Sequence, residues 1–375
     1  MNFDLISIVF VLSLIIARWF LPPRYMGIIY PIYGFTFISY YSPLSALLWL
    51  GFSTALVIFC YIKQFLIRVI ICIVILSLFG GLYKNDFIVV SFPYEFLIFF
   101  VCNLSRGWTM YKYQYAARYD SISLSEMFSF LWFPALLCGG PIETFKEFVK
   151  YHTTRQSIAT LAVTGYFLSS IIAGFLRDFV SNIWNPRLFT FYDATLLQFA
   201  IYFIMASVLL FLRFIAWIHF VRAICHLLGY PFNNANCGNF LFGGGIVQFW
   251  SRLNLSVTSF ARDYLIYPTN RIPTNLETSL RILILVTLMG YLVNFSVYTF
   301  IWGALQGFGF IAHIIYRVLC AKRGFIAKLD KRIPKLIKVI IILTWVFITT
   351  PLLTPEAPIL YEYAGSRLLS LWVLS

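Results

Sequence analysis

This sequence has little charge and very little acidity. Charged residues make up 11% of the 375 residues, with 14 Asp and Glu against 28 Lys and Arg. Soluble globular domains usually carry about 25% charged residues. Hydrophobic residues reach 61%, aromatic residues 20%, and the mean hydropathy is +0.85. The scarcity of charge excludes a soluble globular protein and predicts a chain embedded in lipid.

The chain also has few histidines, and its cysteines are not clustered. The chain holds four histidines, and its seven cysteines lie mostly within apolar runs. No two cysteines follow the Cys-x-x-Cys spacing, and no cysteine and histidine pattern is typical of a zinc site. We therefore predict no metal site. The first apolar run has no basic segment before it and no small-residue cleavage site, so we expect a retained span rather than a removed signal.

Apolar runs long enough to cross a bilayer recur along the whole chain. About 20 apolar residues in a helix cross the roughly 30 Å of hydrocarbon. The runs predict an all-α, polytopic membrane bundle of about ten transmembrane helices, forming a single membrane domain over residues 1–375. The expected spans are Leu5–Phe20, Met26–Tyr41, Leu44–Ile62, Val69–Tyr83, Phe87–Cys102, Ile158–Phe175, Ala194–Phe214, Leu280–Phe300, Trp302–Leu319 and Leu336–Leu353, with Met127–Cys138 as a shorter buried or re-entrant piece.

The net charge of +14 does not indicate a nucleic-acid partner. The basic residues are scattered among short segments between apolar runs, and the densest group lies in the loop Lys322–Lys338. Such loops favour the cytoplasmic side of a membrane and can bind anionic headgroups. We predict no nucleic acid, membrane lipids as partners, and a cytoplasmic location for this loop.

The segment Phe249–Tyr264 concentrates polar residues against this apolar background. Polar groups in or beside a bilayer are costly unless they pair or have a function. At helical spacing, Asn254, Thr258 and Arg262 lie on one face. The alternative interpretation is that these are interfacial side chains with an incidental ion pair. The candidate site residues in this segment are Trp250, Arg252, Asn254, Ser256, Arg262 and Asp263.

Four stretches, in order along residues 105–320, resemble the membrane-bound O-acyltransferase family. Phe249–Ser256 with Phe260–Pro268 resembles the signature of its bacterial branch, which includes the alginate O-acetylation and teichoic-acid D-alanylation proteins. Trp302–Gly307 resembles the W-G-L-x-H-G end of the catalytic helix pair. The other two are Phe133–Ile142, which resembles an F-P-x-x-x-x-G-P-I segment with one extra residue, and Gly229–Phe232, which resembles the loop before the signature.

The resemblance implies a central polar funnel in which a thioester donor meets a hydroxyl acceptor. The donor is acetyl-CoA or a carrier-bound acyl group and no cofactor is bound. The acceptor is a hydroxyl of a cell-envelope or secreted glycan or lipid. Envelope-modification proteins are the implied partners, and a bacterial inner (plasma) membrane is the implied location. Asn254 has the right chemistry to donate to the thioester oxygen, whereas Arg252, Arg262 and Asp263 would fix the segment or face a carrier phosphate.

The chain departs from this family at the catalytic base. An ungapped alignment of Gly290 and Trp302 places Val293 where the family has its histidine, beside Asn294, and valine accepts no proton. Gln306 stands where a second histidine often lies. His219, on an expected apolar helix and seven residues before His226, is the best replacement base, with Asn294 as a substrate contact. Two functions remain open: an active O-acyltransferase, or a silent relative acting as scaffold, acyl channel or lipid-handling partner. A small transporter is a more distant third.

Overall fold

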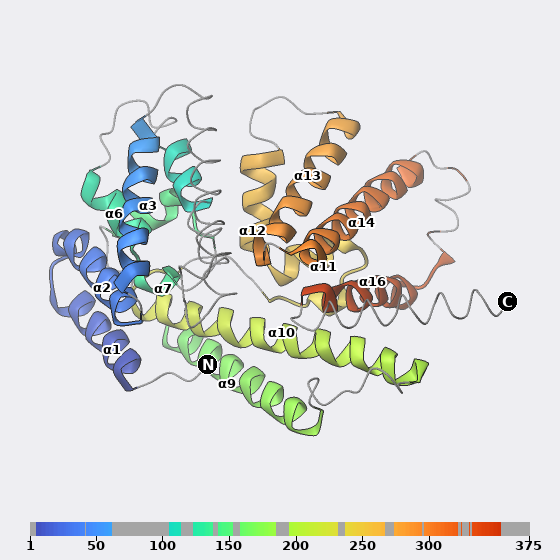
Figure 1. Cartoon of the computed structure of the whole chain (residues 1–375), viewed down its shortest axis with the longest axis horizontal. Coiled ribbons are helices and arrows are strands. Elements are labelled where there is room, and N and C mark those ends of the chain that lie inside the picture. The colour runs from blue at the N-terminus through green and yellow to red at the C-terminus, as the bar shows by residue number, and fades with distance from the viewer. Residues whose placement is uncertain are drawn as a thin grey trace. The chain divides into compact units, whose positions relative to one another are not determined.

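The computed structural model describes the chain in thirteen stretches. These are residues 5–41, 43–61, 105–113, 123–137, 142–152, 158–184, 195–231, 237–266, 274–294, 296–321, 324, 330 and 332–353. Every regular element within these stretches is a helix, which confirms the all-α prediction for this part of the chain. Figure 1 shows the helices in chain order from blue to red.

Four of the described helices are long and apolar enough to cross a membrane: Thr160–Ile183, Leu197–Leu227, Val297–Ala321 and Lys335–Leu353. Two shorter apolar helices cover Ile8–Phe20 and Ala46–Ile58. The chain therefore has the character of an integral membrane protein. The total of about ten spans stays a prediction, and two of the expected spans, Val69–Tyr83 and Phe87–Cys102, lie outside the described residues.

Helix bounds agree with the sequence pattern where an apolar run ends at a clear break. The first three helices are α1 (Leu5–Phe20), α2 (Met26–Tyr41) and α3 (Pro43–Tyr61), with the 3₁₀ turn η1 (Pro23–Tyr25) between α1 and α2. The short piece expected at Met127–Cys138 is divided at Trp132 into α6 (Leu124–Leu131) and α7 (Pro134–Leu137). A capping box of Ser123 and Glu126 begins α6, because each side chain binds the other's backbone N–H.

Three expected spans have wrong bounds. The helix expected to end at Phe175 continues eight residues further, to Ile183. Helix α10 (Leu196–Leu227) continues thirteen residues beyond Phe214, because its polar residues do not interrupt helical hydrogen bonding. The span expected at Leu280–Phe300 is divided between α13 (Asn275–Asn294) and α14 (Val297–Ala321). These two helices form a hairpin in which glycines let the backbones approach. A Cβ on Gly303 would lie 2.6 Å from the Val286 oxygen, and one on Gly290 would lie 2.6 Å from the Thr299 oxygen.

The described chain divides into two compact units. The first holds Met1–Phe167 and His219–Asn234, and the second holds Leu168–Ile218 and Ala235–Ser375. Helices α9 (Thr160–Ile183) and α10 lie side by side (Figure 1). Phe167 contacts Phe220 within the first unit, and Ser170 Oγ donates to the Ala216 carbonyl within the second.

Arg18, almost fully buried near the end of α1, binds the ends of two other helices in the first unit, α8 and α10. Its Nε donates to the Leu228 carbonyl beyond α10 at 3.1 Å, and its Nη2 donates to the Tyr151 carbonyl at 2.9 Å. Tyr151 lies near the end of α8 (Phe145–His152), and the neighbouring His152 carbonyl accepts from Nη1 at 3.4 Å. The guanidinium therefore satisfies carbonyls that a helix end leaves unpaired. It also lies 5.1 Å from the centre of the Tyr230 ring.

The polar segment that begins at Cys237 is a series of short helices in the second unit. They are η3 (Phe240–Phe242), α11 (Ile246–Leu253), α12 (Leu255–Phe260) and the π-helical η4 (Ala261–Ile266). Eight residues of α-helix span only about 12 Å, so none of these helices crosses a bilayer alone. Helix α16 (Lys335–Thr349), followed by η5 (Thr350–Leu353), contributes Val346 to the same apolar cluster as Phe249 and Leu253.

Candidate functional site

Asn254 joins two of the short helices. It is the last cap of α11 and the first cap of α12, with a backbone (φ −137°, ψ 73°) that belongs to neither helix. Its side-chain oxygen accepts from the Val257 N–H at 3.3 Å and from the Ser256 hydroxyl at 3.1 Å. Asparagine is among the best residues for this capping role. The bend at Asn254 therefore holds its side chain in one orientation.

The cap also determines which end of the Asn254 side-chain amide takes part in the capping hydrogen bonds and which end does not. The Val257 N–H can only donate, so the atom that faces it must be the amide oxygen, and the NH2 group points elsewhere. None of the hydrogen bonds recorded among the described residues uses that NH2 group, and the residue is half-buried. Ser256, predicted as a substrate contact, is 1% exposed, and its hydroxyl supports Asn254. A fixed amide donor at Asn254 is what the predicted role requires.

Trp250 connects this segment to two other helices. Its indole Nε1 donates to Gln306 Oε1 on α14 at 3.1 Å, and Gln306 Nε2 donates to the Thr349 hydroxyl on α16 at 2.7 Å. Gln306 is 1% exposed, and both ends of its amide are occupied. The Trp302 ring meets Trp250 edge to face, with centroids 5.7 Å apart. Gln306 therefore acts as a structural link in the position where the resemblance expects a histidine.

His313 lies on the same side of α14 as Gln306, seven residues further along. A Cβ on Gly245, the residue before α11, would lie 2.6 Å from the His313 Cε1 atom, so the imidazole packs directly on the backbone there. Asn254 lies nine positions after Gly245 in the chain, which corresponds to about 13 Å along a helix. His313 is therefore remote from the Asn254 amide. Asn294, the other predicted contact on this hairpin, ends α13, and its side chain lies outside the described part.

Arg252, two residues before Asn254, holds the loop that precedes α11. Arg252 Nη1 donates to the Asn239 carbonyl at 3.0 Å, while the Arg252 carbonyl accepts from the Gly238 N–H at 2.9 Å. Cys237, with a positive φ of 58°, donates its N–H to the Leu253 carbonyl at 3.0 Å. The loop therefore satisfies the carbonyls at the end of α11. This geometry supports the prediction that Arg252 fixes the segment.

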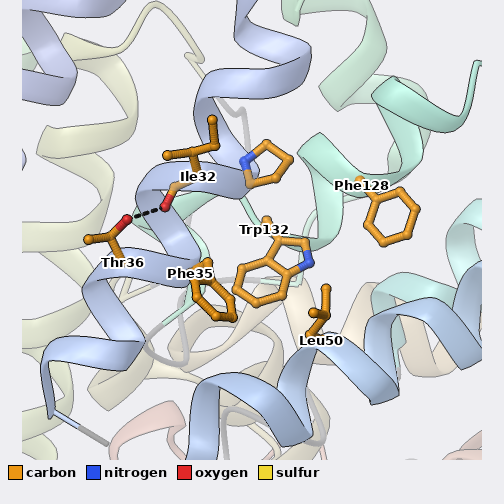
Figure 2. A pocket seen from close by; sticks show the side chains of 7 residues that line it. Ile32, Phe35, Thr36, Leu50, Phe128 and Trp132 are labelled. Carbon is orange, nitrogen blue, oxygen red and sulfur yellow. Dashed lines mark hydrogen bonds between the residues drawn. The ribbon is translucent and has the colours of Figure 1, made fainter. Parts of the chain in front are cut away.

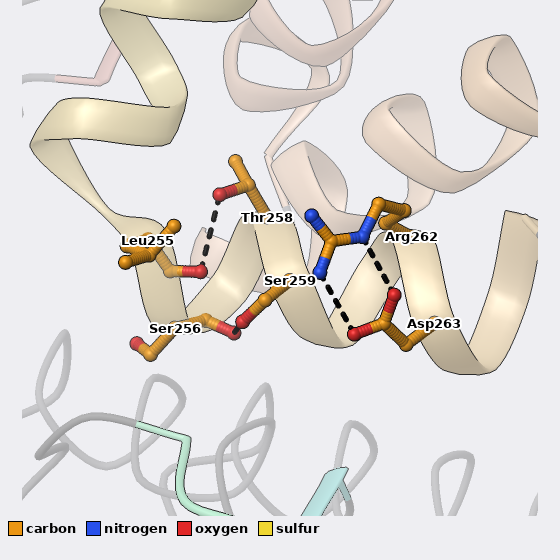
Figure 3. Close-up of polar contacts among 6 residues, drawn as sticks. All are labelled: Leu255, Ser256, Thr258, Ser259, Arg262 and Asp263. Carbon is orange, nitrogen blue, oxygen red and sulfur yellow. Dashed lines mark hydrogen bonds and ion pairs between the residues drawn. The ribbon is translucent and has the colours of Figure 1, made fainter. Parts of the chain in front are cut away.

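Arg262 and Asp263 pair with each other at the surface. Arg262 donates from Nε at 2.6 Å and from Nη2 at 2.9 Å to the two oxygens of the Asp263 carboxylate, as Figure 3 shows. The side chains are 59% and 49% exposed. The hydrogen bond that Arg262 donates to Asp263 raises the pKa of the Arg262 guanidinium above its usual value. Figure 3 also shows Thr258 and Ser259 donating to the helix backbone at Leu255 and Ser256, so their hydroxyls are used within the helix.

His219 belongs to a cluster in the first unit, which we call the Tyr166 cluster: Tyr166 on α9 with His219, Arg222 and His226 on α10. The His219 ring stacks on Tyr166 with centroids 5.8 Å apart, and the His226 ring lies 5.3 Å from the same ring. The expectation that His219 and His226 share one face is confirmed. Asn254 belongs to the second unit, so the pairing of His219 with Asn254 stays a prediction.

His152 is buried, although its neighbours in the sequence are polar. The Lys-, Thr- and Arg-rich surroundings of His152 in the sequence suggest an exposed residue, but it ends the amphipathic helix α8 and is 5% exposed. Its Nδ1 lies 3.0 Å from the Tyr230 hydroxyl, and its ring stacks on Phe148. Burial, reinforced by Arg18, lowers the pKa of His152 to about 4. The apolar spacing of Phe145, Phe148 and His152 was the available signal.

The described residues contain no cluster of three or more His, Cys, Asp or Glu side chains that could hold a metal ion. A cavity of about 340 Å³ lies in the first unit between α2, α3 and α6 (Figure 2). Its walls are almost entirely apolar, and the only polar side-chain groups among its lining residues belong to Thr36 and Trp132. The Thr36 hydroxyl donates to the Ile32 carbonyl, and the Trp132 indole N–H donates to Ser53. This cavity therefore offers no free polar group for catalysis.

Comparison with known proteins does not place the chain in a family. No protein-family model matches it, and no curated protein matches it significantly.

Proposed function

We propose that this protein is a membrane-bound O-acyltransferase that moves an acetyl or other acyl group from a thioester to a hydroxyl. Attack of the hydroxyl oxygen on the thioester carbonyl forms an ester and releases a thiol, and the hydroxyl proton passes to a base and then to the thiolate. The acceptor class is a cell-envelope or secreted glycan or lipid. The donor is acetyl-CoA or a carrier-bound acyl group.

The observation that carries the proposal is the fixed Asn254 amide. Its oxygen is held by Val257 and Ser256, so its NH2 group is a preorganised donor that costs no reorganisation when negative charge develops on the thioester oxygen. A second observation supports it. The Trp250 to Gln306 hydrogen bond joins the two stretches that resemble the signature segment and the catalytic helix pair.

In this proposal His219 is the general base, Trp250 and Ser256 position the segment, and Asn294 contacts substrate. Arg252 and the Arg262–Asp263 pair fix the segment or face the phosphate of a carrier. A polar funnel between the helices brings donor and acceptor together, and the host membrane is a bacterial inner membrane. Envelope-modification proteins supply the acceptor.

The alternative is a silent relative that serves as a scaffold, acyl channel or lipid-handling partner. Two observations favour it. Val293 stands at the expected position of the catalytic histidine, and Gln306, at the second histidine position, has both ends of its amide committed to Trp250 and Thr349. Neither position offers a group that takes up a proton near neutral pH.

Transfer of a labelled acyl group by the purified full-length protein, from thioester donors to a panel of hydroxyl acceptors, tests the two functions. The active enzyme predicts turnover by the wild type and a loss of about 10²–10⁴-fold in His219→Ala, the usual contribution of a general base. The matched control is His313→Ala, because His313 lies remote from Asn254 and should be dispensable. A wild type that transfers nothing while Val293→His gains activity establishes the silent relative. A fully active His219→Ala removes His219 from the site.

A further inference from the structure

The Tyr166 cluster holds a cation within an apolar helix, and no carboxylate among the described residues forms a salt bridge with it. Arg222 makes one recorded hydrogen bond, from Nη2 to the Tyr166 hydroxyl at 2.6 Å, and its guanidinium lies 4.3 Å from the centre of the Tyr166 ring. No salt bridge to Arg222 is recorded among the described residues. Its recorded partners are thus a neutral hydroxyl and an aromatic face, and neither balances the charge.

The two histidines beside Arg222 lack hydrogen-bond partners in the described part of the chain. His219 Nδ1, Arg222 Nε and His226 Nε2 are enclosed without a recorded partner. Arg222 follows His219 by three residues and precedes His226 by four on α10, so its charge lies beside both imidazoles. Leaving polar groups enclosed and unpaired costs about 1–3 kcal/mol each. Three such atoms in one cluster mean that the described helices leave this cluster short of polar partners.

The spacing brings the three side chains to one face. His219, Arg222 and His226 follow at intervals of three and four residues on α10, and Tyr166 on α9 lies against all of them. Each of the four residues is half-buried, so part of each remains accessible, although the three nitrogens named above are enclosed. Several N–H donors that converge around a cation match the oxygens of a phosphate group.

The depth of the cluster suggests where the phosphate comes from. Arg222 lies five residues before the end of α10, about 8 Å along the helix axis. Tyr166 lies six residues after the start of α9, and Tyr166 and Arg222 are hydrogen-bonded, so the cluster lies near one shared end of two candidate spans. Basic and aromatic side chains at this depth reach the headgroup layer of a bilayer.

We infer that the Tyr166 cluster binds the phosphate of a lipid headgroup, with Arg222 as the counter-charge and His219 and His226 as flanking hydrogen-bonding groups. The inference shares His219 with the proposed acyl-transfer site but does not require acyl transfer, because a silent protein with the same helices would bind the same group.

Ligand-induced thermal stabilisation of the purified full-length protein in a neutral detergent tests this inference. The probes are dioctanoyl phosphatidic acid, uncharged dioctanoylglycerol, and inorganic phosphate. The wild type should be stabilised by phosphatidic acid in a saturable manner. Arg222→Gln and His226→Gln should weaken the apparent affinity at least tenfold. Arg177→Gln is the matched control because it removes the same charge from a half-buried arginine of α9 that pairs with Asp178, and it should bind as the wild type does.

Three results would overturn the inference. Equal stabilisation by dioctanoylglycerol would show that only the acyl tails are recognised. Undiminished binding of phosphatidic acid to Arg222→Gln would remove the cluster from the site. An Arg222-dependent shift with inorganic phosphate at the same concentration and of the same size would show that the ligand is a soluble phosphate and not a lipid. The readout is thermal stabilisation by lipid and not acyl transfer, so failure of lipid binding and failure of the proposed acyltransferase give separate results.

Discussion

Arg18 and Arg222 are both arginines on apolar helices of the first unit, yet their surroundings differ. Arg18 is 1% exposed and donates to three backbone carbonyls that helix ends leave unpaired. Arg222 is half-buried and donates to one neutral hydroxyl. The first guanidinium completes the fold, because the fold itself supplies its acceptors. The second has donors that the described fold does not use, which is the property expected of a binding group.

The same distinction applies to two amides in the second unit. Gln306 is enclosed and has both ends of its side chain occupied, so it stabilises the packing of α11, α14 and α16. Asn254 has its oxygen occupied and its NH2 group left over. A side-chain amide with both ends hydrogen-bonded therefore indicates a structural role. A fixed amide whose NH2 group has no partner among the described residues indicates a functional one.

The largest expected effect separates the two arginines. Arg18→Leu should destabilise the protein by about 3 kcal/mol or more, because it removes hydrogen bonds from a charged donor and leaves buried carbonyls unpaired. Arg222→Leu should change the free energy of unfolding by less than about 1 kcal/mol in the absence of ligand, since little of its hydrogen-bonding capacity is used. Denaturant unfolding in detergent measures both. Equal losses of unfolding free energy in Arg18→Leu and Arg222→Leu would contradict the distinction drawn between the two arginines.

The glutamine network gives the next largest effect. Gln306→Leu should cost about 1–3 kcal/mol, because the Trp250 indole N–H and the Thr349 hydroxyl lose their shared partner. Gln248→Leu is the control, since Gln248 is exposed and, among the described residues, its side chain accepts one hydrogen bond, from the Gly244 N–H. Unfolding curves for the two variants that superimpose would show that the network contributes nothing.

His152 provides a pH test of a satisfied, buried histidine. Its folded pKa of about 4 lies below the ordinary value of 6.5, so the unfolded chain binds the proton more readily. The contribution of His152 to stability is full above about pH 6.5 and is lost as the pH falls towards 4. His152→Gln should flatten the unfolding free energy over this interval. A wild type and variant with parallel pH profiles would contradict the burial argument.

The smallest expected effect is at the surface ion pair. Arg262→Gln should change stability by less than about 1 kcal/mol, because exposed pairs of neighbouring side chains gain little and are screened by salt. A scan of the unfolding midpoint at low and high salt measures it. A loss of several kcal/mol would mean that Arg262 has a further structural partner.

The sequence predicts the helices better than their contacts. The runs at Leu5–Phe20 and Met26–Tyr41 are apolar to both ends and agree with α1 and α2, because hydropathy is a local property. The break between Asn294 and Val297 and the burial of His152 depend on which elements pack together, and periodicity alone does not settle that. Thr349 and Tyr166 carry no motif, so only the fold brings them to Gln306 and to Arg222.

Asn254→Asp tests the claim that a leftover donor at Asn254 is functional. Aspartate caps α12 as well as asparagine does, so the variant should unfold within about 0.5 kcal/mol of the wild type. It replaces the NH2 donor with an oxygen, so the rate of labelled acyl transfer should fall by about 10²–10³-fold, the usual cost of one oxyanion donor. A folded Asn254→Asp variant that transfers the acyl group at the wild-type rate would contradict the account.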